Sequence, residues 1–108
     1  MGVHTCDRRS SRTFIAETFP NFDIEDGFTE NDELWVPEVR ESNEERNERL
    51  AEVLREVVVS DDSTYITISL HSGVIMSILE VIGHRPFRLQ TGGIIPVVVK
   101  VNKATHRL

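Results

Sequence analysis

The sequence predicts an α/β domain with two main strands and about three helices. Within residues 65–70 every second residue is aliphatic, which is the side-chain period of a half-buried strand. Residues 94–101 form a second, strongly apolar run. Between them, the apolar residues from Val74 to Ile82 recur at spacings of three and four, as on one face of a helix. Strand, helix and strand in this order predict a right-handed parallel unit.

The first forty residues predict one helix followed by an irregular segment. Asp7 is a good N-cap for a helix that runs through Arg9 to about Phe19, where Pro20 ends it. Residues 21–41 contain many acids and few regular spacings, with a short helix expected only at residues 30–35. Long segments of this kind serve either as functional lids or as plain surface loops.

A second helix is expected to begin after Ser42. Ser-Asn-Glu-Glu is a capping box, in which Glu45 can answer the Ser42 cap. The residues that follow make one apolar stripe, typical of a helix that lies on a sheet. Its members are Leu50, Val53, Leu54, Val57 and Val58.

The remaining signals divide the second half of the chain into elements. A turn is expected at residues 60–63, and Gly83 is a natural residue to follow the end of the third helix. Another turn is expected at residues 91–93. Pro96 cannot donate to a strand ladder, which indicates an edge or a bulge near the start of the last strand.

His71 lies where the first strand ends and the third helix begins. Free N–H groups and the helix dipole at such a junction favour an anion, usually a phosphate. An imidazole there can hydrogen-bond a phosphoryl oxygen or donate a proton. The alternative is that His71 is simply part of the hydrogen-bonded structure.

Composition narrows the class of partner. The formal charge of −6 argues against nucleic-acid binding, although basic residues gather near both ends and could meet an anion or simply face solvent. No run is long enough to span a bilayer. The single cysteine, Cys6, excludes an internal disulfide and a cysteine-based zinc site, and favours a reducing, cytoplasmic location. We expect neither a metal nor a cofactor.

Several short motifs together resemble one known family. Their order and spacing, over nearly the whole chain, are similar to the carboxyl-terminal half of the histidine phosphatase superfamily, in the fungal form of its phosphoglycerate mutase-like branch. The motifs are Cys-Asp-Arg-Arg-Ser (6–10), Phe-Thr-Glu (28–30), Asp-Glu-Leu-Trp (32–35), His-Ser-Gly (71–73) and Thr-Gly-Gly-Ile-Ile-Pro-Val (91–97).

The resemblance implies phosphomonoester hydrolysis or phosphoryl transfer through a phosphohistidine. In that family the nucleophilic histidine lies in an Arg-His-Gly motif, two arginines and a second histidine hold the phosphate, and an acidic residue protonates the leaving group. His71 matches the second histidine, and the backbone N–H of Ser72 would also contact the phosphate. Arg8 and Arg9 are candidates for a substrate-facing loop.

The other catalytic parts have no match, since the sequence contains no Arg-His-Gly. Residues 1–108 are therefore expected to be a truncated part of a single histidine phosphatase domain, inactive alone. The implied fold is an incomplete three-layer α/β/α sandwich whose central strand is missing. The expected partner is phosphate or a phosphorylated small molecule, with self-association through unpaired strand edges. The alternative is a non-catalytic phosphate-binding or acidic protein-interaction module.

Overall fold

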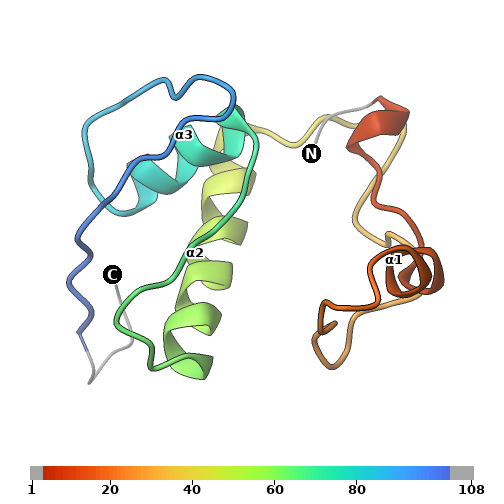
Figure 1. Cartoon of the computed structure of the whole chain (residues 1–108). Coiled ribbons are helices and arrows are strands. Elements are labelled where there is room, and N and C mark those ends of the chain that lie inside the picture. The colour runs from red at the N-terminus through yellow and green to blue at the C-terminus, as the bar shows by residue number, and fades with distance from the viewer. Residues whose placement is uncertain (1–3, 103–108) are drawn as a thin grey trace. The chain divides into compact units, whose positions relative to one another are not determined.

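The computed structural model describes residues 4–102 and divides the chain into two compact units, Met1–Glu41 and Ser42–Leu108. Its elements are a 3₁₀ turn (Thr5–Asp7) and the helices α1 (Arg12–Thr18), α2 (Asn43–Ser60) and α3 (Ser72–Val81), shown in Figure 1. No strand element forms among residues 4–102. The predicted α/β architecture therefore stays a prediction. The elements that the structure describes are all helical.

Helix α1 begins later than the sequence predicts, because Ser11 caps it in place of Asp7. The Ser11 hydroxyl accepts a hydrogen bond from the Phe14 amide at 3.2 Å. The Asp7 carboxylate instead accepts from an amide three residues upstream at 3.0 Å, and the residue after it is extended. The prediction that Asp7 starts a helix through residue 9 is wrong, whereas the end of the helix before Pro20 is confirmed.

The short helix expected at residues 30–35 is absent from the structure. The carboxylate of Asp32 accepts hydrogen bonds from the amides of Leu34 and Trp35, each at 3.1 Å. A side chain that binds amides two and three residues ahead offers the backbone an alternative to helical hydrogen bonds. The segment therefore folds as a turn around Asp32.

The start of α2 confirms the predicted capping box. The Ser42 hydroxyl accepts from the Glu45 amide at 3.2 Å, and the Glu45 carboxylate accepts from the Ser42 amide at 2.8 Å. Of the predicted apolar stripe, Leu50 and Leu54 are buried, whereas Val53 is exposed. The buried face is thus narrower than the sequence pattern suggests.

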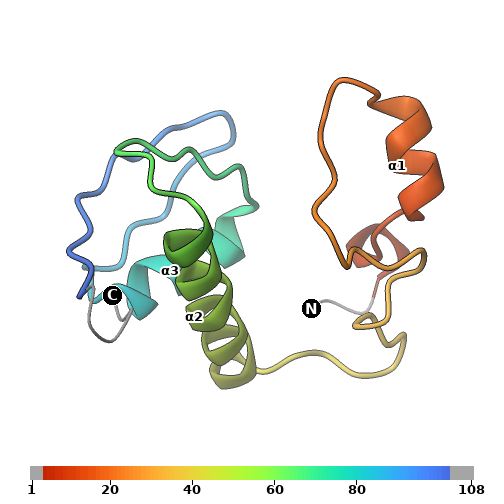
Figure 2. The same cartoon turned by 90° about the horizontal axis from the view of Figure 1, so that it is seen from below.

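Helices α2 and α3 cross and pack against each other in both views (Figures 1 and 2). The buried apolar side chains among the described residues are Leu50 and Leu54 of α2 and Leu79 of α3. Ser77 of α3 is buried beside them. The second unit therefore has a small, leucine-based core between two helices.

Helix α3 ends as the sequence predicts, with Gly83 just beyond its last turn. Gly83 has a φ of 70°, its amide donates to the Glu80 carbonyl, and the His84 amide donates to the Leu79 carbonyl at 2.8 Å. This pair of bonds is a Schellman motif, which requires a left-handed residue that glycine adopts without strain. The expected turn at residues 91–93 also forms, with Gly92 at a φ of 76°.

The two segments predicted to be strands run as uncoiled chain in Figure 1. Their side chains alternate in exposure: Tyr65 and Val98 are 93% and 102% exposed, whereas Ile66 and Val97 are 42% and 39% exposed. Residues 65–70 and 94–101 make no backbone hydrogen bond with other described residues. Both segments thus have the side-chain alternation of strands but lack a pairing partner in the part of the chain that the structure describes.

Candidate functional site

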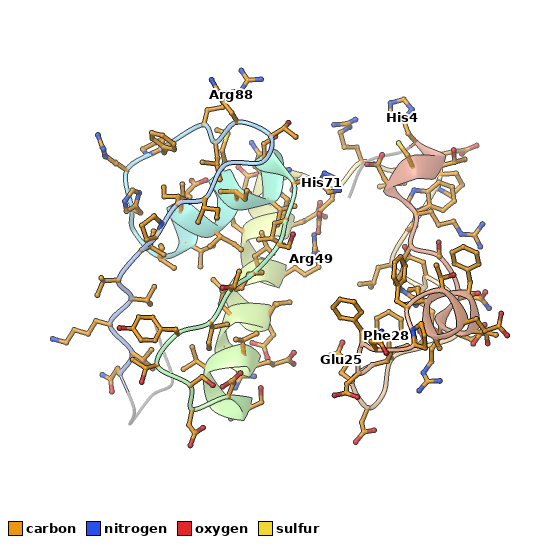
Figure 3. The ribbon with its side chains drawn as sticks, viewed as in Figure 1. His4, Glu25, Phe28, Arg49, His71 and Arg88 are labelled. Atoms are coloured by element: carbon orange, nitrogen blue, oxygen red, sulfur yellow. The ribbon has the colours of Figure 1, made fainter. Side chains whose placement is uncertain are left out.

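His71 is the residue that precedes α3 and serves as its N-cap. Its backbone is extended (φ −82°, ψ 153°), and its carbonyl accepts from the amides of Val74 and Ile75 at 3.0 Å each. The imidazole makes no capping hydrogen bond and the residue is exposed. Figure 3 shows the ring at the start of the helix. The side chain is therefore accessible to a ligand.

The next two amides, of Ser72 and Gly73, make no hydrogen bond within the described part of the chain. A side-chain carbon added at Gly73 would meet no atom within 4 Å, and both residues are exposed. Two free N–H groups therefore point out of the helix end beside the imidazole. Unpaired amides at a helix N-terminus, where the dipole is positive, favour an anion.

Arg9, predicted to face a substrate, holds a loop of its own unit together. Its guanidinium donates to the carbonyl of Ser10 at 2.8 Å and to the carbonyls of Thr29 and Asn31 at 2.9 and 2.7 Å. It also lies over the ring of Phe28, 4.2 Å from the ring centroid. These contacts tie the chain near Arg9 to residues about twenty positions later.

Arg8 makes different contacts from Arg9, although the same role was predicted for both arginines. Its guanidinium lies over the ring of Trp35, 5.6 Å from the centroid. This guanidinium has no hydrogen bond or carboxylate partner among the described residues, and Arg8 is exposed. Of the two candidates, Arg8 keeps its hydrogen-bond donors for an external group. Its role in substrate binding stays a prediction.

Sequence reasoning missed Asp32, the residue that fastens the first unit. Its carboxylate accepts from the Arg9 amide at 2.9 Å as well as from Leu34 and Trp35. Partial burial raises the pKa of Asp32, but the three amide hydrogen bonds and the charge of Arg9 outweigh it and lower the pKa. The signal was present, because Asp often bonds amides two residues on in a turn.

A second missed contact joins α2 to α3. The Nε of Arg46 donates to the hydroxyl of Ser77 at 2.7 Å, and an Nη donates to the Asn43 side-chain oxygen at 2.9 Å. The position of Arg46 four residues before Leu50 places it on the buried side of α2, which the sequence could have indicated. The buried face of a helix is predicted from its apolar residues, so a charged arginine on that face is not expected.

The described residues contain no group of three or more side chains suited to hold a metal ion. Cys6 is a free, exposed thiol. Across residues 4–102, every helix is too short or too polar to pass through a lipid bilayer.

Comparison with curated proteins identifies close relatives. Over 105 residues the chain is 52% identical to a probable phosphoglycerate mutase of Arthroderma benhamiae. It is 42% identical over 101 residues to phosphomutase-like protein 3 of Candida albicans, and 35% identical over 114 residues to a probable phosphoglycerate mutase of Saccharomyces cerevisiae. These alignments cover 97%, 93% and 94% of this chain.

The chain spans about a third of the length of these relatives, with coverage of 31%, 32% and 39% in the same order. No family model and no solved structure matches it. The similarity predicted from the motifs is confirmed by the three alignments. The chain therefore belongs to the phosphoglycerate mutase-like family and corresponds to about one third of the length of its matched members.

Proposed function

We propose that this chain provides one side of a phosphoryl-binding site in a phosphoglycerate mutase-like phosphatase or phosphomutase. His71 and the amides of Ser72 and Gly73 bind the phosphate. The single observation that carries this proposal is that an exposed imidazole and two unpaired amides share one helix end. The natural compartment for such a protein, which has a single cysteine, is the reducing cytoplasm.

The chemistry follows from these groups. Two phosphate oxygens accept hydrogen bonds from the amides of Ser72 and Gly73, where the positive end of the helix dipole stabilises the negative charge. The imidazole of His71 binds a third oxygen as a donor. Nothing in this arrangement supplies a nucleophile in line with a leaving group, and the sequence has no Arg-His-Gly motif. The chain alone thus binds phosphate without turnover.

The completed protein is proposed to be a three-layer α/β/α sandwich. Residues 65–70 and 94–101 support this proposal, because they alternate in exposure as strands do and have no pairing partner among the described residues. Unpaired, half-apolar segments of this kind gain hydrogen bonds and burial when another strand is added. A protein as long as these relatives contains further segments, and one of them is the proposed source of that strand.

A phosphate titration followed by NMR tests the binding site. Inorganic phosphate is expected to shift the signals of His71, Ser72 and Gly73, whereas sodium chloride at equal ionic strength shifts none of them. His71→Ala is expected to weaken the response. His84→Ala is the matched control, since the His84 ring already contacts the Arg85 carbonyl. If phosphate leaves these signals unchanged, the binding proposal is wrong and a protein-interaction module is favoured.

Hydrolysis of p-nitrophenyl phosphate by the purified chain tests the predicted lack of turnover. We expect no hydrolysis above that of buffer. Activity that survives extensive purification and disappears in His71→Ala would contradict the proposal. Such activity would require a nucleophile within this chain, and the proposed site has none.

A further inference from the structure

The hydrogen bond between Arg46 of α2 and Ser77 of α3 joins a charged side chain to a buried hydroxyl. Ser77 is 2% exposed, and its hydroxyl accepts from the Arg46 Nε at 2.7 Å. Arg46 has no carboxylate partner within residues 4–102. A charged donor bound to a buried neutral hydroxyl forms a strong, directional contact. Surface solubility alone does not explain an arginine placed in this way.

This bond links a side chain of α2 directly to a side chain of α3. The buried apolar side chains of the two helices are Leu50 and Leu54 of α2 and Leu79 of α3. Apolar burial is not directional, so it holds the helices together without fixing the rotation of α3 about its own axis. The Arg46–Ser77 bond supplies a directional constraint on that rotation.

The rotation of α3 decides where its N-terminus points. His71 lies six residues before Ser77, which is about 9 Å along the helix at about 1.5 Å per residue. A slip of α3 by one residue turns it by about 100°, and carries the ring of His71 and the free amides to another side. No other described hydrogen bond ties the imidazole in place.

We infer that Arg46 is a positioning residue for the phosphate-binding end of α3, and that it acts through Ser77. This inference rests on the proposed function of His71, Ser72 and Gly73. Arg46 itself binds no phosphate oxygen in this assignment. It sets the direction in which the imidazole and the two amides face.

The test compares variants of the full chain by NMR without ligand. Arg46→Met removes the donor and Ser77→Ala removes the acceptor, and Arg46→Lys keeps the charge but not the planar guanidinium. Arg55→Met is the matched control, because Arg55 lies on the same helix and pairs with Glu52 at the surface. We expect Arg46→Met and Ser77→Ala to shift the His71, Ser72 and Gly73 signals, and Arg55→Met to leave them unchanged.

Phosphate titration provides the second readout. Arg46→Met and Ser77→Ala are each expected to raise the phosphate dissociation constant between about twofold and thirtyfold, the range over which residues without ligand contact modulate a site. The double variant is expected to lose no more than either single variant, since both remove the same bond. Arg46→Lys is expected to recover part of the loss, because its ammonium group can still donate.

The outcomes separate this inference from the proposed function. If the wild-type chain shows no phosphate response, the proposed function fails, and the ligand-free shifts still decide the role of Arg46. The inference is wrong if Arg46→Met and Ser77→Ala leave the His71, Ser72 and Gly73 signals unchanged. It is equally wrong if the two losses add in the double variant. Circular dichroism confirms that each compared variant keeps its helix content, and Ser77→Ala serves if Arg46→Met does not fold.

Discussion

The Asp32 carboxylate accepts the main-chain amide of Arg9 at 2.9 Å, across 23 residues of sequence. The same carboxylate binds the amides of Leu34 and Trp35, while the Arg9 guanidinium binds the carbonyls of Thr29 and Asn31. The side chains of Asp32 and Arg9 thus hold together the two ends of the segment between them. A segment whose ends are joined in this way is a compact loop, and a few hydrogen bonds provide most of its local stability.

Asp32→Asn is expected to loosen this closure. The amide side chain keeps one acceptor oxygen but loses the charge, so the bonds to three N–H groups weaken. We expect the free energy of local opening to fall by about 1 to 2 kcal/mol. Hydrogen exchange of the Arg9, Leu34 and Trp35 amides measures it, and Asp26→Asn in the same unit is the control. Unchanged exchange at these amides would show that Asp32 does not fasten the loop.

The closure should also depend on pH. The pKa of Asp32 lies below its ordinary value of 3.8, because amide hydrogen bonds and the charge of Arg9 outweigh the effect of burial. A carboxyl whose pKa is lower in the folded state stabilises that state above the unfolded pKa, and loses this contribution as the pH falls through the lowered value. Exchange of the Arg9 amide, corrected for its intrinsic pH dependence, should therefore show faster opening only below about pH 4. Asp32→Asn should remove this transition.

Arg9→Lys and Arg8→Lys are expected to behave differently. Lysine cannot reproduce a planar guanidinium that reaches three carbonyls and lies over Phe28, so Arg9→Lys should loosen the loop. Arg8→Lys removes only a contact with the Trp35 ring and should leave the loop closed. Limited proteolysis within residues 13–28 measures the difference. Equal cleavage of the two variants would contradict the structural role assigned to Arg9.

Local signals predicted the elements that local contacts decide. The capping box of Ser42 and Glu45 and the glycine that ends α3 each depend on a few neighbouring residues, and both were predicted correctly. The start of α1 was predicted wrongly because Asp7 and Ser11, which lie within five residues, are both suitable N-cap residues. The Asp7 carboxylate bonds backwards, and the next backbone amide in register, that of Arg9, is taken by Asp32.

The rest of the fold depends on partners that are distant in the sequence. Strand periodicity in residues 65–70 and 94–101 is visible from the sequence, but pairing requires another strand, and none is present among the described residues. For the same reason, no local pattern linked Asp32 to Arg9 or Arg46 to Ser77. The start of α3 after His71 was predicted because the apolar spacing changes from two to three and four at this point of the sequence.

Two glycines near the ends of α3 are expected to respond in opposite ways to alanine. Gly83 has a φ of 70°, where alanine is strained, so Gly83→Ala should destabilise the second unit by about 1 kcal/mol. Gly73 lies in the first turn with open space around it, so Gly73→Ala should stabilise the helix by up to about 1 kcal/mol. Thermal unfolding measures both. A loss of stability in Gly73→Ala would mean that an unseen contact occupies that space.

The unpaired segments are expected to drive self-association. Val98 is fully exposed on residues 94–101, and an apolar, unpaired strand invites pairing with another copy. Val98→Lys places a charge on that segment and should shift the chain towards monomer, since lysine on an exposed strand opposes edge-to-edge pairing. Val59→Lys is the matched control, because Val59 is an exposed valine on α2 and belongs to neither segment. Sedimentation velocity over a series of protein concentrations measures association. A wild-type chain that stays monomeric throughout, with a cooperative unfolding transition, would show that these segments need no partner.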